Sequence, residues 1–186
     1  MKRPIKFLII GESGSGKTNT VQQLEKLGYP TLNSYTTRRP RYDGETGHLF
    51  TSVANYKIEK MVGNVVAWTI FDDNIYFSTL KQLEACSTYV VDIKGAMDLL
   101  EGFGDTYKFI SIYINTTKLT RYKRMRLRGD SFFNTRKRII HDIRAFEHIR
   151  NITNYCVNGN NSVELVMKDI TTIVNEETLQ WQSIKY

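Results

Sequence analysis

The stretch Gly11-Glu12-Ser13-Gly14-Ser15-Gly16-Lys17-Thr18 has the spacing G-x-x-x-x-G-K-[ST]. It follows an apolar run, Ile5 to Ile10, that predicts a buried strand, and helical spacing of apolar residues begins at Lys17. Strand, glycine loop and helix in this order open a parallel α/β fold. Glycines let the loop backbone wrap a phosphate, so that its N–H groups and the helix N-terminus face the anion. The stretch therefore predicts a site for the phosphates of ATP or GTP.

The side chains of this loop match phosphate chemistry. Lys17 is expected to reach the β- and γ-phosphates, and the Thr18 hydroxyl is expected to ligate Mg²⁺. ATP and Mg²⁺ are thus the predicted co-substrate and cofactor. The residues assigned to ATP within the loop are Gly11, Ser13, Gly14, Ser15, Gly16, Lys17 and Thr18.

The rest of the chain continues the alternation of strands and helices. Further strands are predicted at 89–93, 109–114 and 155–157, and helices at 119–128, 135–149 and 163–174. Gly28 is expected to end the first helix. The segment 33–79 fits this alternation poorly, because it combines turn residues with short strand-like pieces. It is interpreted as an insertion into the α/β core.

Charge and length narrow the class of protein. The 186 residues suit one domain, and the net charge of +7 calls for an anionic partner. Between Lys118 and Arg150 eleven cations face three acids. Such a run suits a solvated helix face as well as a phosphate site. RNA is not expected as the partner, because no RRM-like or KH-like motif accompanies the charge.

Other patterns exclude several classes. No apolar stretch approaches the roughly 20 residues that span a bilayer, and the N-terminus lacks the features of a signal peptide. Cys86 and Cys156 are isolated, which argues against a disulfide scaffold or structural zinc and for the cytoplasm. The N-K-x-D element of a GTPase is missing.

A second phosphate-binding pattern follows the first predicted helix. The stretch 33–41 reads Asn-Ser-Tyr-Thr-Thr-Arg-Arg-Pro-Arg. Arg38 and Arg41 lie three apart around a proline and can converge on one phosphate with fork-shaped donors. The Ser34 hydroxyl can add a weaker donor. This half of the site is expected to bind the phosphate acceptor.

These residues resemble the guanylate kinase family, whose acceptor motif is S-x-T-T-R-x-P-R followed by G-E. Further similar segments occur in family order: Trp68 with 74–78, the strand 90–93, the arginine-bearing stretches 126–129 and 136–139, and the strand end 155–158. The resemblance implies the α/β P-loop kinase fold, with a parallel sheet core flanked by helices. It divides the chain into a core (1–32, 80–116, 150–186), a monophosphate-binding insertion (33–79) and a helical lid (117–149).

The resemblance also implies an activity: ATP-dependent transfer of the γ-phosphoryl group to GMP or dGMP. Partners would be small-molecule nucleotides, with no membrane, and the chain would be a monomer or homodimer. The implied catalytic residues are Lys17, Arg38, Arg126, Arg128 and Arg138. The implied acceptor residues are Ser34, Arg38, Arg41, His48, Tyr76, Ser78 and Asp92, and Asn158 is placed near the adenine of ATP.

Three departures from the family concern the acceptor. The acidic residue that the family has beside Trp68 is Ala67 here, its phosphate-binding Tyr is His48, and the segment after Asp92 is shorter. The acceptor range is therefore expected to be altered. A kinase for another phosphorylated acceptor, such as a modified deoxynucleotide or ribose bisphosphate, stays open. A non-catalytic interaction module is less favoured, because such modules typically lose the loop that Gly16, Lys17 and Thr18 retain.

Overall fold

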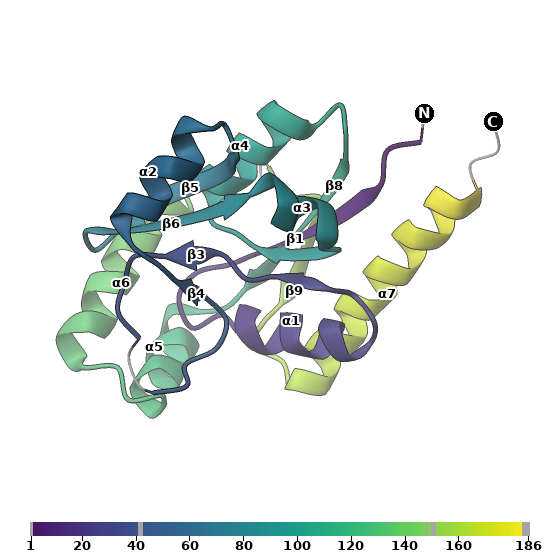
Figure 1. Ribbon diagram of the computed structural model, residues 1–186. Coiled ribbons are helices and arrows are strands. Elements are labelled where there is room, and N and C mark those ends of the chain that lie inside the picture. Colours follow the sequence, from purple (N-terminus) through teal and green to yellow (C-terminus); the bar gives the residue numbers. More distant parts are fainter. Residues whose placement is uncertain (1, 41–42, 148, 150–151, 184–186) are drawn as a thin grey trace.

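A five-stranded parallel sheet forms the centre of the chain in the computed structural model, which describes residues 2–40, 43–147, 149 and 152–183. The strand order is β2-β7-β1-β8-β9, and every neighbouring pair is parallel. Its strands are β1 (Ile5–Ile10), β2 (Thr31–Leu32), β7 (Thr88–Val90), β8 (Lys108–Asn115) and β9 (Tyr155–Asn158). The strand that precedes the glycine loop thus lies in the middle of the sheet (Figure 1).

The two faces of this sheet carry separate apolar cores. In β1, Phe7 and Ile9 face one core while Leu8 and Ile10 face the other, because successive side chains of a strand alternate. Helices α1 (Lys17–Lys26) and α7 (Val163–Ser183) pack on the first face. Helices α3 (Leu80–Ala85) and α4 (Ile93–Phe103) pack on the second. The helix-covered parallel sheet confirms the predicted α/β fold class.

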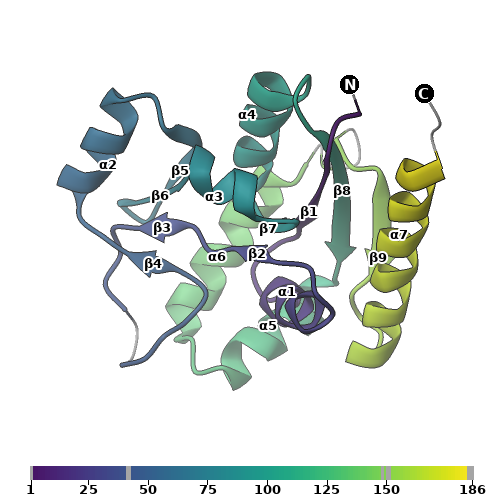
Figure 2. The ribbon, with the colours of Figure 1, turned by 45° about the vertical axis from the view of Figure 1, so that its right-hand side comes forward.

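Residues 35–79 build a second, four-stranded sheet in the order β4-β3-β6-β5. It contains β3 (Tyr35–Thr36), β4 (Leu49–Phe50), β5 (Val65–Phe71) and β6 (Asn74–Thr79), with α2 (Val53–Met61) between β4 and β5. The β5–β6 hairpin turns at Asp72 and Asp73, whose φ angles of 53° and 59° are those of a type I′ turn. Figure 2 shows this sheet to one side of the parallel sheet.

Helices α5 (Lys118–Leu127) and α6 (Phe132–Ala145) follow β8. Gly129, with φ of 96°, and the N-cap Ser131 separate the two helices. Helix α6 reaches the tip of the β5–β6 hairpin, where Lys137 pairs with Asp72 and the Arg138 guanidinium lies 5.3 Å from the Phe71 ring centre. One helix therefore touches the second sheet as well as the core.

Several element ends differ from the sequence prediction. Strand β7 ends at Val90 and not at Ile93, because the Asp92 carboxylate accepts the Gly95 N–H at 2.8 Å and starts α4. Helix α6 begins at Phe132 instead of 135, because Ser131 caps it, and it ends at Ala145 instead of 149. Helix α7 runs nine residues beyond the predicted end at 174. None of the described helices has the length and apolar character needed to cross a membrane.

Candidate active site

The glycine loop between β1 and α1 has two positions whose backbone conformation favours glycine. Gly14 and Gly16 have φ angles of 79° and 112°. A Cβ atom on Gly14 would also lie 2.9 Å from the Arg121 carbonyl oxygen, so the loop rests directly on α5. The Ser15 N–H donates to the Glu12 carbonyl at 3.1 Å and closes the turn. This geometry is that of a phosphate-binding loop ahead of a helix N-terminus.

Lys17 folds back over this loop. Its Nζ donates to the carbonyl oxygens of Gly11 at 2.6 Å and Glu12 at 3.0 Å. Burial lowers the pKa of Lys17 to about 8, and the nearby carboxylates of Asp142 and Glu12 partly oppose this shift. Phosphate oxygens bound beside Lys17 would favour its protonated form and so raise its pKa again.

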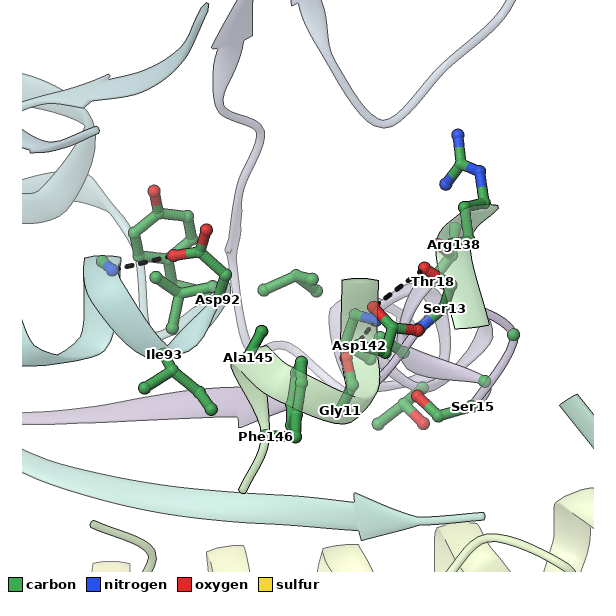
Figure 3. Close-up of a pocket in the computed structure, with 18 of the residues that line it drawn as sticks. Gly11, Ser13, Ser15, Thr18, Asp92, Ile93, Arg138, Asp142, Ala145 and Phe146 are labelled. Carbon is green, nitrogen blue, oxygen red and sulfur yellow. Dashed lines mark hydrogen bonds between the residues drawn. The ribbon is translucent and has the colours of Figure 1, made fainter. Parts of the chain in front are cut away.

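A cavity of about 870 Å³ opens in front of the loop and extends to the second sheet. One end is lined by the loop residues Gly11 and 13–18. The other end is lined by Ser34, His48 and Tyr76, and Asp92 lines the same space. Figure 3 shows Asp92 on one side of this pocket and Thr18 with Arg138 on the other. All seven loop residues assigned to ATP therefore face the same space as four of the assigned acceptor residues.

The acceptor end combines one hydroxyl, one imidazole and one phenol. Ser34 Oγ lies 3.1 Å from His48 Nδ1, and the His48 ring meets Tyr76 edge-on at 5.4 Å between ring centres. These residues come from the loop before β3, the loop before β4, and β6. Hydroxyl and N–H groups that converge in this way suit a phosphate or a base carbonyl.

Other predicted acceptor residues lie elsewhere. The Arg38 guanidinium makes a two-pronged ion pair with Glu45 at 2.9 and 3.1 Å, and Arg38 is not among the residues lining the cavity. Its side chain does lie beside Tyr76. Ser78 is fully buried and accepts a hydrogen bond from the Tyr89 hydroxyl at 3.0 Å. Arg41 lies outside the described residues. Direct contact of Arg38 or Ser78 with an acceptor would therefore require these pairs to open.

Of the three arginines in the lid segment that are predicted to be catalytic, two line the cavity and one does not. Arg128 and Arg138 line the cavity. Arg126 is exposed, and its guanidinium donates to the Asp130 carbonyl. Arg124 also lines the cavity, and it bridges the Ser15 and Gly159 carbonyl oxygens at 3.1 and 2.9 Å. The basic run contained Arg124, but spacing alone does not separate it from Arg126.

The cavity also suits a hydrated Mg²⁺ ion. Thr18 offers its hydroxyl oxygen to it beside the phosphate loop, whereas Asp92 lies on the opposite side of the cavity and caps α4 (Figure 3). Mg²⁺ usually takes one or two protein oxygens, phosphate oxygens and several waters, so this sparse donor set fits it. Within the described residues, no three His, Cys, Asp or Glu side chains gather into a dedicated metal cage. Any Mg²⁺ here would therefore depend on phosphate oxygens.

The predicted adenine residue, Asn158, lies beside the cavity but does not line it. Its side chain accepts from the Asn160 amide groups at 3.0 and 3.1 Å. Its neighbours Gly159 and Asn161 do line the cavity. The end of β9 thus borders the site, while the role given to Asn158 itself stays a prediction.

Asp142 on α6 is a site residue that sequence patterns did not indicate. Its carboxylate lines the cavity and accepts the Ser13 N–H at 2.9 Å. It lies four residues after Arg138, which places both on one side of α6. That spacing was the available signal, but it does not reveal a contact with a loop 129 residues earlier in the chain.

Comparison with known proteins bears on the fold. No protein-family model matches the chain, and no curated protein matches it. Among solved structures, the guanylate kinase from Anaplasma phagocytophilum superposes with a TM-score of 0.68 over 95% of this chain and 87% of its own, at 18% sequence identity. A likeness at this identity concerns the fold. The chain accordingly has the α/β P-loop fold that is found in this guanylate kinase.

Proposed function

We propose that this chain is an ATP-dependent nucleoside monophosphate kinase. The observation that carries the proposal is the single cavity that joins the phosphate loop to the Ser34, His48 and Tyr76 cluster. A kinase must hold donor and acceptor phosphates in one space, so that the attacking oxygen lies in line with the bond to be broken. A module that only binds a partner needs no such continuous cavity next to an intact Lys17.

The side chains around the cavity suit phosphoryl transfer. The transferring group spreads negative charge over its oxygens, and catalysis consists mainly of positioning and of fixed positive charge. Lys17, Arg128 and Arg138 supply that charge from the loop and from the lid segment 117–149. Bound at Thr18 and phosphate oxygens, Mg²⁺ would add further neutralisation. Ser34 and His48 would hold the acceptor at the opposite end.

GMP or dGMP is the proposed acceptor because the chain resembles guanylate kinases. The side of the cavity expected to bind the base, however, lacks the acidic residue of that family. Guanine offers N1–H and an amine side by side, which a carboxylate accepts best. Ala67 lines the cavity and accepts neither. Glu45 is paired with Arg38 and Asp72 with Lys137, and neither lines the cavity. Two carboxylates do line the described cavity, but Asp92 already accepts the Gly95 N–H, and Asp142 already accepts from Ser13 and Arg121. We therefore expect an acceptor range broader than guanine nucleotides.

A second candidate is a kinase of the same fold for another phosphorylated acceptor. Ala67 favours it, because an acceptor without guanine has no need of the carboxylate that is missing at this cavity-lining position. Modified deoxynucleotides and ribose bisphosphate both carry phosphates without a guanine base. They belong in the same assay panel.

The test is ADP formation with Mg²⁺–ATP and one of the following acceptors: GMP, dGMP, dTMP, UMP, AMP, a modified deoxynucleoside monophosphate or ribose bisphosphate. We expect activity with at least one nucleoside monophosphate. The preference for guanine over other bases should be about ten- to a hundredfold weaker than that of a site whose carboxylate forms a charge-assisted pair with guanine. Ala67→Glu should raise that preference, and the neutral control Ala67→Gln should not. A wild-type preference for GMP above about a thousandfold would contradict the argument from Ala67.

A further inference from the structure

A buried charged cluster joins α5 and α6 to the phosphate loop. Arg121 of α5 is only 1% exposed. Its Nη1 donates to Asp142 Oδ2 at 2.8 Å, and its Nη2 lies 3.9 Å from Glu12 Oε1. Asp142 is 5% exposed. These side chains come from the phosphate loop, α5 and α6, and the Arg121–Asp142 pair is almost completely shielded from water.

The cluster acts on the loop through one carboxylate oxygen. Asp142 Oδ2 accepts both from Arg121 and from the Ser13 backbone N–H, the latter at 2.9 Å. The Ser13 hydroxyl lies 3.5 Å from the other oxygen, Oδ1. Figure 3 shows the Asp142 carboxylate directed at Ser13. Arg121 thus fixes the direction of Asp142, and Asp142 fixes the Ser13 amide.

The residues on either side of Ser13 are also held from outside the loop. The Tyr113 hydroxyl of β8 donates to Glu12 Oε2 at 2.9 Å. Gly14 lies against the α5 backbone at Arg121, as described above. Three consecutive loop residues, 12 to 14, therefore take their positions from side chains and backbone of β8, α5 and α6. Lys17 donates to the carbonyl oxygens of Gly11 and Glu12, where this segment begins.

Stability alone does not account for this arrangement. Replacing a buried ion pair with apolar residues is often neutral or stabilising, because the desolvation of both charges is then avoided. A buried pair that contacts the phosphate loop points instead to a need for defined geometry. Small displacements of reacting groups can lower a rate on the order of a hundredfold.

We propose that Arg121 is a positioning residue for phosphoryl transfer: it orients Asp142, which holds the Ser13 amide and so sets the shape of the phosphate loop. This inference rests on the proposed kinase function. It requires the Arg121–Asp142 pair to stay in place when ATP binds. The opposite arrangement, in which the Asp142 carboxylate merely occupies an anion site and is displaced by ATP, makes different kinetic predictions.

The kinetic test compares Arg121→Met, Asp142→Asn and their combination, with Lys123→Met as the control on the exposed side of α5. Arg121→Met should lower kcat about ten- to a hundredfold with a smaller change in the KM for ATP. Arg121→Lys should restore part of kcat, and Lys123→Met should keep wild-type values. In the Asp142→Asn background, Arg121→Met should lower kcat by no more than about twofold, because both residues act through one contact.

Three kinetic results would overturn the proposal. The first is an unchanged kcat in folded Arg121→Met protein. The second is a double variant whose fold-loss in kcat equals the product of the two single losses, and the third is tighter ATP binding by Asp142→Asn. The last result would mean that the carboxylate competes with ATP.

A second readout does not depend on catalysis. The Ser13 amide should give a downfield ¹H resonance in wild type that moves in Asp142→Asn and also in Arg121→Met or Arg121→Lys, although Arg121 does not touch Ser13. If the Ser13 resonance has the same chemical shift in both Arg121 variants as in wild type, Arg121 does not act on Ser13 through Asp142, and the proposal is refuted. If wild type transfers phosphate to no acceptor, the proposed function fails while this amide test still decides whether Arg121 controls the loop.

Discussion

At the scale of single residues, the site depends on charges that are incompletely neutralised without a nucleotide. Lys17 illustrates this, because its ammonium group is held by two carbonyl oxygens and burial lowers its pKa to about 8. Phosphate oxygens would favour the charged form and raise that pKa again. Nucleotide binding near pH 8 should therefore be coupled to protonation of Lys17.

The sign of this coupling is testable. At pH 8 about half of the empty sites hold an uncharged Lys17, so ATP binding should take up about half a proton, and affinity should fall as the pH rises above 8. Calorimetry in buffers of different ionisation enthalpy measures this uptake. Lys17→Arg is the matched control, since its guanidinium stays charged and should show no uptake near pH 8. Equal uptake by both proteins would assign the proton to another group.

At the scale of helices and strands, α6 connects the parts of the site. Near its start Lys137 pairs with Asp72 of the second sheet, and near its end Asp142 holds the phosphate loop. The His141 ring also meets Phe71 edge-on at 5.0 Å between ring centres. A helix that contacts both substrate-binding ends is placed to respond when both substrates are bound.

This arrangement predicts protection of the segment 117–147 by ligands. The guanidinium groups that line the cavity there, those of Arg124, Arg128 and Arg138, should be drawn towards phosphates when these arrive. Amide hydrogen exchange in α5 and α6 should slow when an analogue joining ATP to a nucleoside monophosphate binds. The last two thirds of α7, from Ile170 to Ser183, are the internal control and should keep their exchange rates. Unchanged exchange throughout α5 and α6 would contradict a lid role.

Elements with a strong local pattern were predictable from the sequence. Strands β1 and β8 are apolar runs, and the phosphate loop is a contiguous motif, so neighbouring residues determine each of them. The predicted end of β7 was wrong because Val91 is buried beyond the strand, and its apolar character gives no sign that the chain turns there.

Ion pairs that form only after the chain has folded could not be predicted from the sequence pattern. Arg38 was assigned to a phosphate, but its pairing with Glu45 depends on how the loop before β4 folds back. Likewise, no local signal links Arg121 to Asp142, since two helices must pack before the pair exists. Residue type indicated a phosphate site with several cations, while tertiary packing determined which of those cations line the cavity.

At the scale of the whole molecule, two sheets and a pair of helices enclose one cavity. The parallel sheet carries the phosphate loop, and the second sheet carries Tyr76 on β6 and His48 in the loop before β4. Arg124 and Arg128, at the end of α5, and Arg138 of α6 line the cavity between them. The net charge of +7 adds a general attraction for nucleotide phosphates. This arrangement supports the proposed transfer of a phosphoryl group from ATP at the phosphate loop to an acceptor held by the second sheet.

The most direct measurement follows the γ-phosphoryl group of ³²P-labelled ATP in the presence of Mg²⁺ and a nucleoside monophosphate. We predict that label appears in the corresponding nucleoside diphosphate, and that folded Lys17→Ala protein forms it about 10²–10³-fold more slowly. Label released as inorganic phosphate in place of the diphosphate, or equal transfer by Lys17→Ala, would contradict the account.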